Sequence, residues 1–364
     1  MGVEDHRFPC NNCGSDLRFD PGGDQLICDH CGSVESIDHG PWDRSEAIAE
    51  LDFAATLRDT LDGAEMEQAQ TSHCPNCGAR IEFDTAVHAK ECPYCATPVV
   101  IDTGATRQIK PRAVVPFELS EEQAREAMSG WLGSLWFAPN GLTQYARKGR
   151  RLSGVYTPCW TFDADTKTQY TGQRGIEYQT TRTVTRNGKR QTQTQTKVRW
   201  TSVSGRVARF FDDVLVVAST ALPEKFRTGL GHWDLTRLEP YLPQYLAGFR
   251  AEAYTVSLEE GFEQGRAIMD RQIHRDIKFD IGGDRQRVQS VNTRVSDVTF
   301  KHILVPVWLA AYKYRGESFR FVVNGQTGQV AGERPWSVWK LTFAAIAVAI
   351  IAGIIGYAAA VNQG

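Results

Sequence analysis

Cys10-Asn-Asn-Cys13 with Cys28-Asp-His-Cys31, and later Cys74-Pro-Asn-Cys77 with Cys92-Pro-Tyr-Cys95, form the pattern that decides the front of this 364-residue chain. In both copies fourteen residues separate the two Cys-Xaa-Xaa-Cys pairs. Two cysteines that are separated by two residues share a tight turn, and their sulfurs face one point. The sequence therefore predicts two separate groups of four sulfurs.

Four thiolates at the corners of a tetrahedron are the usual ligands of a structural zinc ion. We predict two zinc ions and expect both to be structural, because a shell of four sulfurs leaves no open coordination position. Disulfide bonds, a thioredoxin-type redox pair and iron–sulfur ligation are the alternatives, and the spacing favours zinc over them. The predicted ligands are Cys10, Cys13, Cys28, Cys31, Cys74, Cys77, Cys92 and Cys95.

Each cysteine group is expected to shape a small β zinc ribbon, over residues 1–40 and 72–103. The predicted hairpins pair residues 17–19 with 25–27 in the first ribbon, and 80–83 with 89–90 in the second. Neither ribbon can bury a sufficient core, so the metal is expected to supply about 10–16 kcal/mol of folding free energy. With eight of nine cysteines in these pairs and no recognisable secretory leader, we expect a reducing compartment.

An acidic segment, residues 41–71, joins the two predicted ribbons. Residues 43–67 contain eight acidic side chains against Arg44 and Arg58, a net charge of −6. Ser45 is a candidate N-cap for a helix that continues to Leu61. We expect a solvated helical linker, with an acidic docking surface as the alternative.

Residues 104–334 are predicted to form a duplicated α+β domain, mainly of antiparallel sheet. Each half contains a strand, a helix and a strand with a Pro-Xaa-Trp run, and a capping box at Ser120 opens the helix of the first half. Cys159, in the first such run, corresponds to Val307 in the second, so its thiol is expected to be a small buried hydrophobic group. The matching segments are 114–119 with 253–258, 120–131 with 259–273, and 158–160 with 306–308.

A basic hairpin is predicted over residues 174–206, because Asn187-Gly188 between alternating residues is a strong hairpin signal. This stretch contains eight Lys or Arg residues and only Glu177 as an acid, a net charge of +7. Three interpretations remain open: an inert solvated edge, contact with phosphates of lipid or nucleic acid, and docking on the acidic linker. The candidate contact residues are Arg182, Arg186, Lys189, Arg190, Lys197 and Arg199.

A tail anchor is predicted in residues 335–364. Residues 341–361 contain no charge, and about 21 helical residues reach ~31 Å, enough for a hydrocarbon core of ~30 Å. Trp336, Trp339 and Lys340 precede this stretch as interfacial residues do, and the basic residues before it place the bulk of the chain in the cytoplasm, at the plasma membrane. Ala345, Ala349 and Gly353 form a small-residue stripe that suggests helix pairing and a homo-oligomer.

Together these features resemble a family of bacterial proteins with transcription-factor-IIB-type zinc ribbons and a C-terminal membrane anchor, whose members are often labelled primosomal protein N′-like. The resemblance rests on the eight cysteines and on residues 156–163, 211–216 and 322–328. It implies a recruiting role at the membrane, in a membrane-stress response. The helicase itself is not implied, because no GxxxxGK[ST] motif is present.

The sequence therefore predicts a multidomain, non-enzymatic adaptor that recruits a cytoplasmic protein partner to the inner membrane. The alternative is a membrane-associated nucleic-acid-binding protein that uses its ribbons and hairpin on phosphates. No spacing of Ser, His, Asp or Glu predicts catalysis, so an enzyme is not expected.

Overall fold

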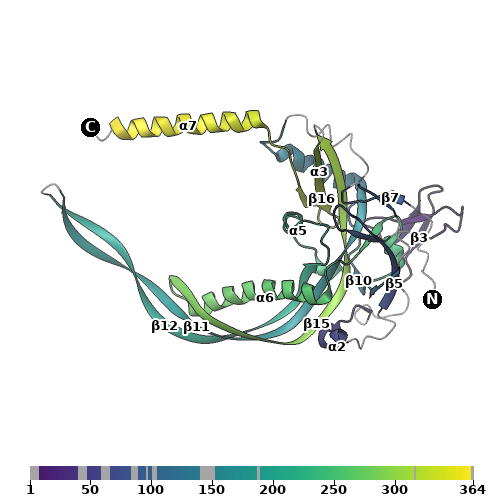
Figure 1. Cartoon of the computed structure of the whole chain (residues 1–364), viewed down its shortest axis with the longest axis horizontal. Coiled ribbons are helices and arrows are strands. Elements are labelled where there is room, and N and C mark those ends of the chain that lie inside the picture. The colour runs from purple at the N-terminus through teal and green to yellow at the C-terminus, as the bar shows by residue number, and fades with distance from the viewer. Residues whose placement is uncertain are drawn as a thin grey trace.

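A computed structural model shows a mixed α+β chain with a large sheet, a long β arm and an apolar C-terminal helix (Figure 1). It describes residues 8–39, 47–58, 66–82, 89–95, 97–100, 105–139, 152–186, 189–314 and 317–361.

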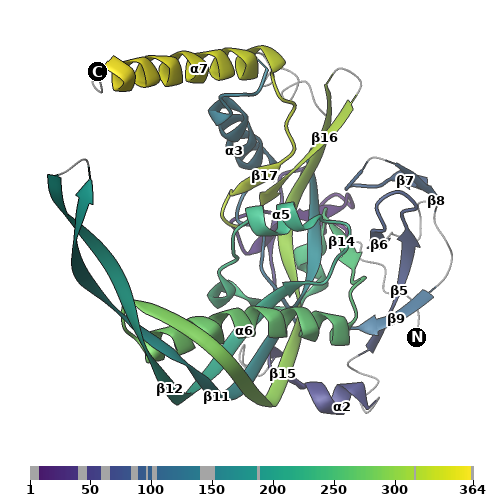
Figure 2. The same ribbon diagram turned by 60° about the vertical axis from the view of Figure 1, so that its left-hand side comes forward.

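Two long antiparallel strands form the centre of the sheet. β11 (Ser153–Arg186) pairs with β15 (Arg285–Tyr314) from Ser153 opposite Leu309 to Gly175 opposite Arg285. β12 (Lys189–Val217) pairs with β11 along its other edge. Beyond Gly175 only β11 and β12 continue, so the arm ends in a two-stranded tip (Figure 2).

The hairpin is longer than the predicted residues 174–206. Its register runs from Arg186 opposite Lys189 back to Cys159 opposite Val217, while the Asn187-Gly188 turn lies outside the described residues. Residues 211–217 are the base of β12. From Ala164 opposite Phe211 to Arg186 opposite Lys189 the register runs without a shift, so the pairing continues from the body into the polar tip.

Short strands and helices surround the central pair in a repeated order. β10 (Ala113–Val114) lies parallel to β15 and precedes α3 (Glu121–Ser134), whereas β14 (Arg250–Ala253) lies parallel to β11 and precedes α6 (Leu258–Ile281). Both helices begin with a capping box, at Ser120 and at Ser257. The same strand–helix–long strand order therefore occurs on both sides of the β11–β15 pair.

The remaining elements lie at the ends of this sheet or in the cysteine ribbons. They are β1 (Leu17–Phe19), β2 (Gln25–Cys28), β3 (Val34–Ser36), β4 (Leu51–Asp52), α2 (Phe53–Leu57), β5 (Met66–His73), β6 (Arg80–Glu82), β7 (Ala89–Glu91), β8 (Pro98–Val100), β9 (Ala105–Ile109), α5 (Glu224–Gly229), the 3₁₀ turns η2 (Leu235–Arg237) and η3 (Pro243–Leu246), β13 (Glu239–Pro240), β16 (Glu317–Asn324), β17 (Val330–Gly332) and α7 (Val338–Val361).

The expected linker helix from Ser45 to Leu61 is wrong in its described part. Leu51 pairs with Phe300 as part of β4, so this segment joins the edge of the large sheet. Ala47 is helical, but the helix does not continue through residues 48–52. A new helix covers residues 53–57, where the Asp52 carboxylate accepts the Ala55 N–H at 2.6 Å. Ser45 lies outside the described residues.

α6 covers one side of the arm. Its buried residues Met269, Ile273 and Ile277 share a core with Trp160 and Phe162 of β11. A Cβ at Gly261 would lie 2.5 Å from the Trp160 ring, so the glycine permits the close approach of helix and sheet.

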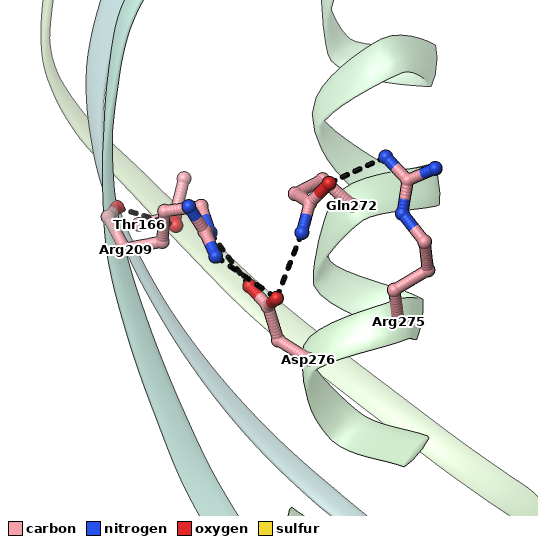
Figure 3. A network of polar contacts seen from close by, with 5 residues as sticks. All are labelled: Thr166, Arg209, Gln272, Arg275 and Asp276. Atoms are coloured by element: carbon pink, nitrogen blue, oxygen red, sulfur yellow. Dashed lines mark hydrogen bonds and ion pairs between the residues drawn. The ribbon is translucent and has the colours of Figure 1, made fainter. Parts of the chain in front are cut away.

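Polar contacts also hold α6 to the arm farther from the body (Figure 3). The Asp276 carboxylate accepts two bonds from Arg209 of β12, at 2.6 and 3.0 Å, and one from Gln272 at 2.9 Å. Gln272 in turn accepts from Arg275, and the Thr166 hydroxyl donates to the Arg209 carbonyl at 2.8 Å. The arm and the helix therefore behave as one layer rather than as two separate projections.

An elbow marks the place where the arm leaves the body. The pairing register of β11 with both of its neighbours shifts next to Asp163. On those neighbours, Asp213 of β12 and Asp297 of β15 have positive φ angles of 49° and 53°. The Lys301 ammonium lies 2.9 Å from Glu50 and 2.8 Å from Asp213, and only 8% of its side chain is exposed. Burial raises the pKa of the nearby Asp163 carboxyl to about 7.

Replacing Lys301 with alanine should destabilise the elbow. Glu50, Asp163 and Asp213 bring carboxylate oxygens within 4.8 Å of one another, and the ammonium offsets this repulsion. We expect a loss of about 3–5 kcal/mol in the free energy of unfolding, measured by denaturant titration. The exposed Lys167→Ala change on the arm is the control, and equal losses from both variants would contradict this account.

Candidate metal centres and the arm

The first cysteine group has the geometry of a closed four-sulfur site. The Cys10 and Cys31 sulfurs lie 3.6 Å apart, and those of Cys13 and Cys28 lie 3.5 Å apart. Gly14 follows the first turn with a φ of +74°, which a side chain would strain. All four sulfurs lie within 4.8 Å of one another.

The second group repeats this geometry. The Cys74 and Cys95 sulfurs are 3.5 Å apart, and those of Cys77 and Cys92 are 3.6 Å apart. Gly78 has a φ of +78°, as Gly14 does in the first group. The four cysteines are buried or half-buried, so this group is more enclosed than the first.

These distances fit metal ligands and exclude disulfide bonds. A disulfide requires about 2.05 Å between sulfurs, whereas four sulfurs at about 2.3 Å from one tetrahedral ion lie roughly 3.8 Å apart. Both groups are therefore compatible with one bound metal ion each. Cys159, the ninth cysteine, is buried in the sheet core and belongs to neither group, and burial raises the pKa of its thiol.

Hydrogen bonds prepare one sulfur in each group to ionise. The Ser33 hydroxyl, 3.1 Å from the Cys31 sulfur, lowers the pKa of that thiol to about 5. The neighbouring Cys92 thiol lowers the pKa of Cys77 to about 5. Because metals bind the thiolate, both environments favour the form that a metal requires.

The first ribbon packs on the body through η3 and the loop before α3. The Phe19 N–H donates to the Ala247 carbonyl at 2.9 Å, and the Gly22 N–H donates to the Phe117 carbonyl at 2.9 Å. The Tyr245 ring lies 5.2 Å from the Phe19 ring, and its hydroxyl donates to Asp24 at 2.9 Å. The β1–β2 hairpin forms as predicted, with β3 as a third strand.

The second ribbon differs from the prediction. Its expected hairpin of residues 80–83 with 89–90 is wrong among the described residues: β6 pairs with β5 and β14, and β7 pairs with β8. The reason is burial, because Ile81 is fully buried against the body and its strand continues the large sheet. Phe83 lies outside the described residues.

A buried polar group ties the second ribbon to the body. Tyr94, between Cys92 and Cys95, donates its hydroxyl to the Glu252 carboxyl group of β14. The Ser219 hydroxyl donates to the same carboxyl group at 2.6 Å. Desolvation by burial raises the pKa of Glu252 to about 8. Sequence reasoning missed this contact, since no local pattern links positions 94 and 252.

The candidate phosphate-binding residues lie far from both cysteine groups, on the tip of the arm (Figure 1). Arg182, Lys197 and Arg199 are exposed, and the Arg199 guanidinium lies 5.6 Å from the Tyr178 ring centre. Arg186, Lys189 and Arg190 are placed only by the pairing of their strands. Docking of the hairpin on the acidic linker was the third interpretation. The linker residue Glu50 instead accepts a hydrogen bond from Lys301 at the elbow, at 2.9 Å.

Comparison with known proteins identifies a distant relative that matches nearly the whole chain. The chain is 26% identical over 340 residues to the uncharacterized protein YdjG of Bacillus subtilis (strain 168). The aligned region covers 92% of this chain and 91% of the relative. No protein-family model matches the sequence, and no solved structure is significantly similar.

Replacing Cys74 and Cys77 with serine should reduce the bound metal from two ions to one per chain, because the first group is a separate site. The loss should also loosen β14, since Tyr94 would no longer hold Glu252. Metal analysis and hydrogen exchange of β14 measure both effects. Cys159→Ala is the control and should keep both ions; a double-serine variant that retains two ions would contradict the assignment.

Glu252→Gln should flatten the pH dependence of stability. The folded pKa of about 8 lies above the ordinary value of 4.5, so the wild-type carboxyl group stabilises the fold fully below about pH 4.5, and this contribution is lost as the pH rises toward 8. The difference between the two proteins should change by about 1 kcal/mol per pH unit in this window. Denaturant titrations from pH 5 to 8 test this, and parallel curves would contradict it.

Proposed function

We propose that this chain is a non-enzymatic, membrane-anchored adaptor whose two cysteine ribbons hold structural zinc and recruit a cytoplasmic protein to the inner face of the plasma membrane. In this proposal the chain is a member of the family that its cysteines and residues 156–163 resemble. Zinc suits the sites because it accepts four thiolates in tetrahedral geometry and needs no further ligand.

The observation that carries the proposal is an apolar helix with no protein cover. α7 includes a 19-residue stretch, Val338–Gly356, that is long and apolar enough to cross a membrane, and none of it is buried against the described residues. Each large aliphatic side chain gains about 1.5–3 kcal/mol on leaving water. A bilayer supplies this burial on all sides of the helix, as its uniformly apolar surface requires.

The junction before α7 has the residues expected at a membrane surface. Trp336 and Trp339 are exposed, and the Arg334 guanidinium lies 4.3 Å from the Trp336 ring. The Lys340 ammonium donates to the carbonyls of Trp136 and Ala138 at 3.0 and 2.9 Å. Tryptophan and basic side chains favour the interfacial region, so this junction supports insertion of the helix that follows.

Nucleic-acid binding at the membrane is the second candidate, favoured by the form of the tip. The tip is a two-stranded ribbon on which Arg182 pairs directly with Gln193, and a two-stranded ribbon fits the major groove of DNA. Binding of the detergent-purified protein to a DNA duplex and to anionic vesicles, each measured against salt, separates the candidates. Preference for the duplex supports the second.

Removing residues 338–364 should release the protein into the soluble fraction with both metal ions retained. In the proposal, insertion of α7 holds the protein at the membrane, so the chain without α7 should no longer be retained there. Fractionation of cell membranes with an alkaline wash measures it. A substitution control, Ser337→Ala, leaves the helix in place and should stay membrane-bound; retention of the truncated chain would contradict the anchor.

A further inference from the structure

One side of the arm is a bare sheet face. From position 164 to 171 of β11 the even-numbered residues are buried and the odd-numbered residues are exposed. α6 covers the buried side, where the Tyr170 hydroxyl donates to Asp280 at 2.5 Å. The exposed side is directed away from α7, and no described element covers it (Figures 1 and 2). We call it the outer face: the odd-numbered residues 165–175 of β11 and the residues that pair with them on β12 and β15.

The outer face is strongly basic. One acid, Asp165 at its elbow end, stands against five basic side chains, which are Lys167, Arg206, Arg285, Arg287 and Arg294. Arg285 binds Glu177, just beyond the face, at 2.5 Å. Lys167, Arg206 and Arg294 are exposed and have no ion-pair partner among the described residues. Their charges are therefore free to meet an anionic partner.

The helix on the other side of the arm has no such excess of charge. In the outer half of α6 the acids equal the Lys and Arg residues in number, with Asp270, Asp276 and Asp280 against Arg271, Arg275 and Lys278. Attraction of a polyanion therefore selects the outer face and not the α6 side.

Polar side chains fill the middle of the outer face. A recess there is lined by Gln169 and Thr171 of β11, Ser204 and Arg206 of β12, and Ser290 and Asn292 of β15. The Thr171 and Ser290 hydroxyls are 2.6 Å apart, so these two strands present one continuous row of polar groups. Hydroxyl, amide and guanidinium groups are the usual partners of phosphate and sugar oxygens.

Exposed rings lie at both ends of this polar stretch. Phe210, opposite Asp165 near the elbow, is 58% exposed. Trp200, opposite Gly175, lies across that glycine, where a Cβ would come within 2.9 Å of the ring. The exposed Arg287 guanidinium lies 3.9 Å from the Trp200 ring centre. Aromatic rings and arginine planes are the surfaces on which unpaired bases stack.

We propose that the outer face of the arm binds single-stranded nucleic acid. The phosphates contact Lys167, Arg206 and Arg294, and bases stack on Phe210 and on the Arg287–Trp200 pair. Positions 165–175 cover about 33 Å of strand, so one extended segment of nucleic acid reaches both ends. A duplex hides the faces of its bases inside its own stack and leaves the two rings without a partner.

Two other kinds of partner fit this face less well. A protein interface has an apolar centre, whereas the outer face carries no large apolar side chain between Phe210 and Trp200. Interfaces with nucleic acid are more polar and more positively charged, as this face is. An anionic bilayer is the poorer partner because, in the function proposed above, α7 enters it and the outer face is directed away from α7.

Charge reversal in the full-length, detergent-purified protein tests the phosphate contacts, with a fluorescent oligothymidine strand as the probe and anisotropy as the readout. The triple change Lys167→Glu, Arg206→Glu and Arg294→Glu should weaken binding about tenfold or more and reduce the slope of log K against log salt by about 2. The matched triple Arg271→Glu, Arg275→Glu and Lys278→Glu, with the same change in net charge, should leave both unchanged. Far-UV circular dichroism reports folding, and equal effects of the two triples overturn the proposal.

Stacking is tested with two exposed phenylalanines on opposite sides of the arm. Phe210→Ala should weaken binding of the same strand about fivefold or more, because a base loses its stacking partner. Phe279→Ala, at a position that is 90% exposed on α6, should leave the affinity unchanged. Equal affinities of these two variants contradict the stacking site.

Competition identifies the partner and the site. Unlabelled single strands should displace the probe better than a duplex of the same length, poly-glutamate or anionic vesicles do, and equal displacement by any of these overturns the proposal. The tip supplies a further comparison through Arg182→Glu, Lys197→Glu and Arg199→Glu. If the tip variant loses the single strand while the outer-face triple keeps it, the site is the tip and the proposal fails.

Vesicle flotation keeps this proposal apart from the proposed anchor. A protein that floats with vesicles but binds no oligothymidine retains the anchor and overturns the outer-face site. A protein that binds oligothymidine in detergent but fails to float contradicts the anchor and supports the outer-face site.

Discussion

Four sulfurs held within one small volume are the constraint on which this structure depends, and the constraint occurs twice. Each cysteine group shapes a ribbon that contributes to a core of the body rather than standing apart from it. Cys10, Phe19 and Cys28 share a buried cluster with Phe117 and Tyr156. Ile81, Cys92 and Tyr94 share another with Val155 and Val307. A metal bound at either group therefore stabilises the body as well as the ribbon.

The body in turn orients two projections of opposite character. The elbow at Asp163, Asp213 and Lys301 directs a polar arm away from the sheet, and α6 stiffens its first part through Asp276 and Arg209. The apolar α7 begins at the other end of the body and projects in the same general direction as the arm (Figure 1). The arm is polar, whereas α7 is long and apolar enough to cross a membrane. In the function proposed above, α7 enters the bilayer and the polar arm stays outside it.

Local signals allowed much of the fold to be predicted. The cysteine spacing placed both four-sulfur groups, the Ser120 capping box placed α3, and the uncharged stretch 341–361 placed the apolar helix. Each of these depends on residues close together in the sequence. The predicted linker helix was wrong because Leu51 finds a partner strand near position 300, which no local period encodes.

Long-range burial also explains what sequence reasoning missed around the site. Arg80 to Glu82 have strand character, but the choice of β14 rather than β7 as partner is made by the buried environment of Ile81. The contact of Tyr94 with Glu252 joins residues 158 positions apart. The polar hairpin was recognisable from Asn187-Gly188, whereas its length required knowing that β15 supports β11 as far as Gly175.

Native mass spectrometry of the intact protein, purified without added metal, tests the central claim most directly. The account predicts two zinc ions per chain, with the eight paired cysteines protected from alkylation until a chelator removes the metal. A chain without metal, with those cysteines freely reactive or joined in disulfides, would contradict it.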